Sequence, residues 1–189
     1  MNIHHINHQL LSIEKVQEII KSNSQLALSD EAKASIEKSR QFLNQKMKTA
    51  TAPVYGINTG FGSLCNTVIS DNDLGKLQEN LVKSHACGMG EKVPAEIVKL
   101  MLLLKIQGLS YGYSGVQLVT VQRLVDFYNH DILPVIYTQG SLGASGDLAP
   151  LAHLSLPLLG LGEVHFKGEI KPAAEINKIF GWQDRKSVV

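Results

Sequence analysis

Apolar residues recur through most of the chain at the three- and four-residue spacing that places side chains on one face of a helix. Near the N-terminus, Ile13, Val16 and Ile19 follow Ser12, a residue type that favours the position before a first helical turn. The pattern predicts a mainly α protein. We expect helices after Ser12, from Ser29 to about Lys46, from Ser70 to about Ser84, and over residues 94–111, 116–129, 148–159 and 173–180.

The helical pattern is interrupted by short segments of β-branched and aromatic residues. We expect short strands near residues 53–55 and 132–136, and a small hairpin over residues 163–171, where alternating residues flank a Lys-Gly pair. Ser70 is expected to begin its helix with Asp73 as a capping-box partner. The helix over residues 94–111 is apolar on more than one face, which predicts that it is buried among other helices.

Composition excludes several function classes. The chain has 189 residues, a length typical of one domain, and a net charge of +1 from 18 basic and 17 acidic residues. The sequence lacks a basic stripe interleaved with aromatic residues, which is the pattern that indicates a nucleic-acid partner. The apolar stretches are too short or too interrupted to span a bilayer, and no secretory signal pattern is present. We therefore expect no nucleic-acid partner and no membrane partner.

The cysteines and the N-terminal histidines add little chemistry. Cys65 and Cys87 are far apart in sequence and form no Cys-x-x-Cys pattern, which favours reduced thiols in the cytosol. His4 and His8 have the spacing of a metal-binding pair on a helix, but a third ligand is lacking nearby. We expect a solvated N-terminus without a metal.

Small residues are concentrated in residues 140–150, GSLGASGDLAP, directly before an apolar run. Glycine at this density lets a backbone turn tightly and approach itself closely. In such a turn, the amide of Gly146 can attack the carbonyl of Ala144, and loss of water there and from Ser145 leaves an electrophilic methylidene-imidazolone ring. Ordinary side chains offer no comparable electrophile. The alternative is a glycine-rich loop that caps a helix at Asp147.

Residues 140–153, GSLGASGDLAPLAH, resemble the signature of the aromatic amino acid ammonia-lyases, and residues 55–62 and 84–91 resemble two further segments of that family. The resemblance implies a cofactor, 4-methylidene-imidazol-5-one, formed autocatalytically from Ala144-Ser145-Gly146, with no metal or nucleotide. It also implies the N-terminal, cofactor-loop portion of a helical-bundle fold shared by ammonia-lyases and fumarase-like enzymes. The helix after the triad would point its positive end at developing negative charge.

The same resemblance assigns site residues. Tyr55, in the segment YGINTGFG, stands where the family has a catalytic tyrosine, and Asn58 and Gly60 would position the substrate or the oxygen of the ring. Ser84 and His85, in the segment SHACGMGE, stand in the substrate-selecting segment, where Ser-His accompanies histidine as the substrate. A buried imidazole needs a polar partner, so this pairing has a physical reason.

The implied reaction is elimination of ammonia from L-histidine to give trans-urocanate, the first step of histidine degradation. A phenylalanine or tyrosine lyase, or an aminomutase of the same family, is the alternative enzyme. The resemblance covers residues 1–183, about the first third of the family's length, and the complete site belongs to a homotetramer. Residues 184–189 match nothing in the family and are expected to be a non-native tail, and the chain alone is expected to be catalytically incomplete.

A serine hydrolase using Ser145, Asp147 and His153 is a further alternative. The sequence around Ser145 nearly matches a nucleophile elbow, but Asp147 replaces its final glycine. Asp147 and His153 are six residues apart on one expected helix, so their side chains would not face each other.

Overall fold

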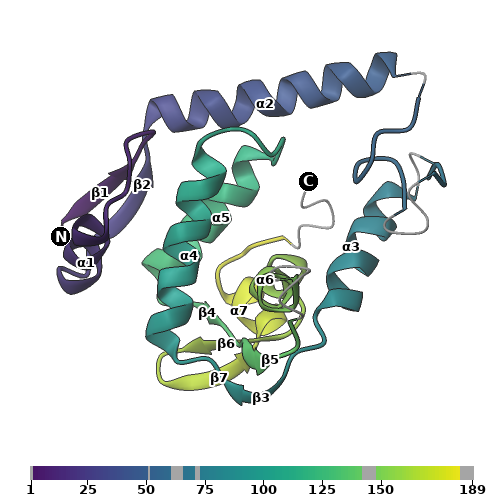
Figure 1. Ribbon diagram of the computed structural model, residues 1–189. Coiled ribbons are helices and arrows are strands. Elements are labelled where there is room, and N and C mark those ends of the chain that lie inside the picture. The colour runs from purple at the N-terminus through teal and green to yellow at the C-terminus, as the bar shows by residue number, and fades with distance from the viewer. Residues whose placement is uncertain (1, 51, 61–65, 71–72, 142–147, 184–189) are drawn as a thin grey trace.

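The computed structural model describes residues 2–50, 52–60, 66–70, 73–141 and 148–183. Most of these residues are helical, as the hydrophobic pattern predicts (Figure 1). The helices are α1 (Ile13–Lys21), α2 (Asp30–Thr49), α3 (Leu74–His85), α4 (Ala95–Ser110), α5 (Leu118–Asn129), α6 (Leu148–Ser155), the 3-10 helix η3 (Leu156–Leu159) and α7 (Ala173–Ile179). The strands are β1 (Ile3–Ile6), β2 (Gln25–Leu28), β3 (Met89–Lys92), β4 (Leu133–Pro134), β5 (Tyr137–Gln139), β6 (Glu163–Phe166) and β7 (Glu169–Pro172).

The first two helices begin at the serines that the sequence indicates. The Ser12 hydroxyl accepts a hydrogen bond from Lys15 N, and the Ser29 hydroxyl accepts one from Ala32 N at 3.1 Å. Each hydroxyl satisfies an amide that the first helical turn leaves without a partner. Helix α2 lies across one end of α4 and α5 and buries a single narrow stripe, which includes Ala32 and Ile36 (Figure 1).

The core lies where α4 and α5 pack together. Both helices bury large apolar side chains on their facing sides, because their apolar residues recur at helical spacing. The side chains buried there include Val98, Leu102, Leu103, Ile106, Val121, Leu124, Val125 and Phe127. One face of α4 is left uncovered, with Ile97 45% and Leu104 50% exposed.

The N-terminal segment is not a solvated tail, contrary to expectation. Strand β1 pairs in parallel with β2 from Ile3 with Gln25 to Ile6 with Leu28, and Ile6 is fully buried. The His8 Nε2 atom lies 3.0 Å from the carbonyl oxygen of Ser110 at the end of α4. Parallel pairing needs a remote partner strand, which the local pattern of residues 1–11 does not reveal.

The second half contains two small sheets. Strands β4, β6 and β7 form an antiparallel sheet in that order, and the expected hairpin turns at Lys167 and Gly168, both with positive φ. Strands β3 and β5 form a separate antiparallel pair. The helix expected over residues 148–159 changes to a 3-10 helix after Ser155, because Pro157 has no amide hydrogen for an α-helical bond.

Two local predictions are wrong. Residues 53–55 form no strand, since the Val54 amide donates to the Asn58 side-chain oxygen at 2.7 Å and Tyr55 begins a turn. Helix α3 begins at Leu74 rather than Ser70, because the Ser70 hydroxyl donates to the Asp73 carboxylate at 2.7 Å and caps no helical amide. None of the side chains of α3 is fully buried.

No helix among the described residues is both long and apolar enough to cross a membrane. Residues 184–189, the expected non-native tail, lie outside the described residues.

We predict that Gly108→Ala stabilises the protein by about 0.5–1 kcal/mol. Gly108 is an exposed residue inside α4, and an added Cβ meets no atom within 4 Å. Alanine loses less backbone entropy than glycine when it enters a helix. Urea unfolding of both proteins measures the difference, and a lower stability of Gly108→Ala would contradict the placement of residue 108 in this helix.

Candidate active site

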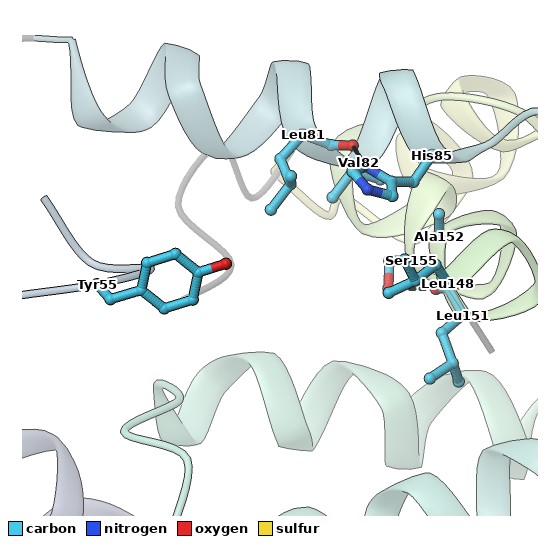
Figure 2. Close-up of a pocket in the computed structure, with 8 residues that line it drawn as sticks. All are labelled: Tyr55, Leu81, Val82, His85, Leu148, Leu151, Ala152 and Ser155. Atoms are coloured by element: carbon cyan, nitrogen blue, oxygen red, sulfur yellow. Dashed lines mark hydrogen bonds between the residues drawn. The ribbon is translucent and has the colours of Figure 1, made fainter. Parts of the chain in front are cut away.

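A cavity of about 460 Å³ opens between α3 and α6, with the turn at Tyr55 on its third side (Figure 2). The phenol of Tyr55 extends toward the two helices, and the Tyr55 side is the exposed one, since this residue is 62% exposed. Most of the remaining lining is apolar. The lining residues are Tyr55 from the turn, Leu81, Val82 and His85 from α3, and Leu148, Leu151, Ala152 and Ser155 from α6.

The Tyr55 turn is held by side chains of its own segment. The Asn58 side-chain oxygen accepts the Val54 amide, and the hydroxyl of the buried Thr59 accepts the Gly56 amide at 3.2 Å. Gly56 has φ near 77°, a conformation that glycine adopts without the steric cost of a Cβ. The spacing of Gly, Asn and Thr after Tyr55 therefore fixes the backbone turn from which the phenol projects.

His85 lies at the C-terminal end of α3, where its ring contacts the helix itself. Its Nδ1 atom is 2.8 Å from the Leu81 carbonyl oxygen, to which the Ser84 hydroxyl also donates at 2.9 Å. A carbonyl oxygen only accepts, so Nδ1 carries the proton and Nε2 keeps its lone pair in the neutral ring. His85 thereby offers the pocket an acceptor for an N–H group.

The structure brings together some of the predicted site residues. Tyr55 and His85 share the pocket, and Ser84 lies beside His85. Asn58 and Gly60 lie in the Tyr55 turn and are not among the described lining residues, and the Gly60 amide donates to the Thr67 carbonyl. The triad Ala144-Ser145-Gly146 lies outside the described residues. One residue separates it in sequence from Leu148, which does line the pocket.

The sequence did not reveal that His153, on α6, bonds to the segment that follows His85. The Gly88 amide donates to His153 Nε2 at 2.9 Å, and the buried ring packs edge-on against Tyr137 with centroids 5.3 Å apart. Burial lowers the pKa of His153 below its ordinary value. Because Nε2 already accepts this bond, its lone pair is not free to act as the base that the hydrolase alternative requires. Ser145 and Asp147, its other members, lie outside the described residues.

Two backbones approach closely beside His153. A Cβ on Gly140, which has φ of 133°, would lie 2.9 Å from the Gly88 Cα, and a Cβ on Gly88 would lie 2.9 Å from His153 Nε2. Strands β3 and β5 produce this approach, since Met89 pairs with Gln139. The segment that contains His85 and the start of the glycine-rich loop therefore meet at one point.

Among the described residues, no group of three or more His, Cys, Asp or Glu side chains is placed to hold a metal ion. The pocket lining supplies a phenol, an imidazole acceptor, the Ser155 hydroxyl, which donates to the Leu151 carbonyl, and an apolar wall.

Comparison with known proteins places the chain in a class. A family model described as aromatic amino acid lyase matches residues 11–186. The histidine ammonia-lyase of Deinococcus radiodurans is 47% identical over 166 residues, which is 88% of this chain and 32% of that protein. The structure of histidine ammonia-lyase from Trypanosoma cruzi matches with a TM-score of 0.85 at 32% identity, over 97% of this chain and 36% of that one. Phenylalanine aminomutase of Pantoea agglomerans matches with a TM-score of 0.89 at 26% identity, over 100% and 36%.

The chain therefore belongs to the aromatic amino acid lyase family, as its motifs predict. Its mainly α fold, with a few short strands, is that of part of the family's larger helical structure. The chain spans about a third of the length of the relatives that it matches.

We predict that Gly140→Ala destabilises the protein by about 2 kcal/mol or more, because the added Cβ combines an unfavourable φ with overlap of the Gly88 backbone. Gly168→Ala is the matched control, since Gly168 also has positive φ, but its Cβ would meet no atom within 4 Å. The control should cost about 1 kcal/mol. Equal losses in urea unfolding would show that the close approach adds no constraint.

We predict that acid weakens the fold through His153. The pKa of His153 lies below its ordinary value of about 6.5 because the ring is buried, so the unfolded chain binds a proton more readily than the folded one. The stabilisation is complete above pH ~6.5 and is lost as the pH falls toward the folded-state pKa. Urea unfolding over a pH series should show a steeper acid loss in the wild type than in His153→Gln, and parallel curves would contradict this.

Proposed function

We propose that the chain is the N-terminal part of a histidine ammonia-lyase, which eliminates ammonia from L-histidine to give trans-urocanate. The observation that supports this best is the pocket that joins Tyr55 and His85 to the start of α6, which is separated from Ala144-Ser145-Gly146 by one residue. The identity of 47% to a curated histidine ammonia-lyase supports the same substrate.

The triad is proposed to form 4-methylidene-imidazol-5-one, which supplies an electrophile that turns the substrate amine into a better leaving group. The residues on either side of the triad fit this role. Gly140 holds one end of the loop against Gly88, and Leu148 begins the helix that forms a pocket wall. Both ends of the loop are therefore anchored at the site where the substrate would lie.

Tyr55 is proposed to remove the β-proton of the substrate. This proton is weakly acidic, so catalysis depends on its alignment with the phenol oxygen. The turn made by Asn58 and Thr59 supports such alignment because it holds the backbone amides on both sides of Tyr55. We assign Asn58 and Gly60 to the placement of this turn and, through it, of the substrate.

Ser84 and His85 are proposed to select histidine. The proton on His85 Nδ1 is directed to the Leu81 carbonyl, so Nε2 can accept the N–H group of a substrate imidazole. A phenyl ring would leave this acceptor without a partner in an apolar pocket, which costs binding energy. Ser84 holds the same carbonyl and thus supports the orientation of the ring.

The active form is proposed to be a cytosolic homotetramer in which further chain completes the pocket. The pocket is open beside the exposed Tyr55, and α4 presents Ile97 and Leu104 on an uncovered apolar face. Most apolar residues of α5 are already buried, so the need for a partner is concentrated on α4. The exposed free thiol of Cys87 supports a reducing compartment. We infer that the chain alone is inactive.

A chimera tests the function. Residues 1–183 replace the matching third of the Deinococcus radiodurans relative, and the product is incubated separately with histidine, phenylalanine and tyrosine. We expect turnover of histidine only. The turnover is measured by the ultraviolet absorbance of the conjugated acid and by the release of ammonia. Intact mass should be lower than the sequence mass by two waters, and Ser145→Ala should lose both the mass change and activity.

The double variant Ser84→Phe/His85→Leu tests the selection of substrate in the same chimera. We expect it to lower kcat/KM for histidine about 10- to 100-fold, because the imidazole loses its partner. Turnover of phenylalanine or tyrosine by the unmodified chimera would instead favour the alternative, a phenylalanine or tyrosine lyase or an aminomutase. The phenylalanine aminomutase of Pantoea agglomerans, whose structure this chain resembles, is an enzyme of that kind. No turnover and an unmodified mass would contradict the proposal.

A further inference from the structure

His153 joins the two walls of the pocket. It lies on α6 beside Ala152, which lines the pocket. Its hydrogen-bond partner Gly88 comes three residues after His85, the last residue of α3. The bond from the Gly88 amide to Nε2 therefore connects α6 to the segment that holds His85. We propose that His153 is a positioning residue, whose neutral ring sets the place of His85 relative to α6 and so acts on histidine through His85.

The tautomer of His153 follows from its donor. A backbone amide can only donate, so Nε2 accepts and the proton of the neutral ring resides on Nδ1. Among the described residues, two titratable side chains adjoin this contact: Tyr137, which packs against the ring, and the exposed Cys87, which precedes Gly88 in the chain. Burial lowers the pKa of His153 and so favours the neutral ring.

The space around the contact leaves little freedom for another arrangement. A Cβ on Gly88 would lie 2.9 Å from His153 Nε2 and 3.2 Å from the Tyr137 Cβ, so the backbone at Gly88 leaves no room for a side chain between the His153 ring and the first side-chain carbon of Tyr137. On the other side, the Gly88 Cα is closely approached by Gly140. A side chain at residue 153 without an acceptor would leave the Gly88 amide unpaired at this crowded point, and the 84–88 segment would shift to satisfy it.

Amide hydrogen exchange of the 189-residue chain tests the contact without any need for activity. We compare the wild type with His153→Leu, which lacks an acceptor, and His153→Gln, which retains one. Exchange at Gly88 should be slower by about tenfold in the wild type and in His153→Gln than in His153→Leu. His165→Leu, on strand β6 away from the pocket, is the matched control and should leave Gly88 unchanged. Rapid exchange at Gly88 in the wild type would overturn the proposal.

A double-mutant cycle in the chimera tests the action through His85, and this step rests on the proposed function. His153→Leu should lower kcat/KM for histidine on the order of tenfold when His85 is present, with His153→Gln restoring most of it. In a His85→Leu background the same substitution should have an effect below about threefold, because the group that it positions is gone. Equal effects in both backgrounds would overturn positioning through His85.

Failure of the proposed function and failure of the positioning role of His153 give different results. A chimera without lyase activity contradicts the proposed function, whereas exchange at Gly88 still decides whether His153 holds the segment. Full activity of His153→Leu toward histidine in an active chimera would overturn the positioning role alone.

Discussion

The close approach of the backbones at Gly88 and Gly140 is the constraint on which the site depends. Strands β3 and β5 bring these residues together, and an added Cβ at either position would fall within 3 Å of a neighbouring atom. One backbone leads from the helix that ends at His85, and the other leads into the loop before α6. The pocket exists in its observed form because two segments more than fifty residues apart in sequence share this point.

Two histidines at the site differ in how their lone pairs are used. At His85 the proton is directed to the carbonyl of Leu81, so the accepting nitrogen is left for the pocket. At His153 the accepting nitrogen is occupied by the Gly88 amide, and burial opposes its protonation. In the roles proposed for them, His85 serves recognition and His153 serves placement, and the local hydrogen-bond partner of each ring decides which nitrogen is left to accept.

Pocket and core differ in how completely the chain covers them. The interface of α4 and α5 is buried, whereas α3 has no fully buried side chain and Tyr55 is mostly exposed. The elements nearest the proposed chemistry are therefore the ones whose side chains are least buried by the rest of this chain. The chain is about a third as long as the relatives that it matches. This distribution agrees with a site completed by further chain, while the helical core is formed largely within these residues.

The sequence by itself determined the helical class, the serine caps of α1 and α2, the hairpin at Lys167-Gly168 and the family, because each depends on residues close together in the chain. It also indicated Tyr55 and His85, but not that they face one pocket. Tertiary structure decided the parallel pairing of β1 with β2, the turn in place of a strand at Tyr55, and the bond between Gly88 and His153. Two of these join segments distant in sequence, and the third depends on a side chain capturing a backbone amide in competition with strand pairing. Periodicity records which face of an element is buried, and it contains no information on the partner that covers that face.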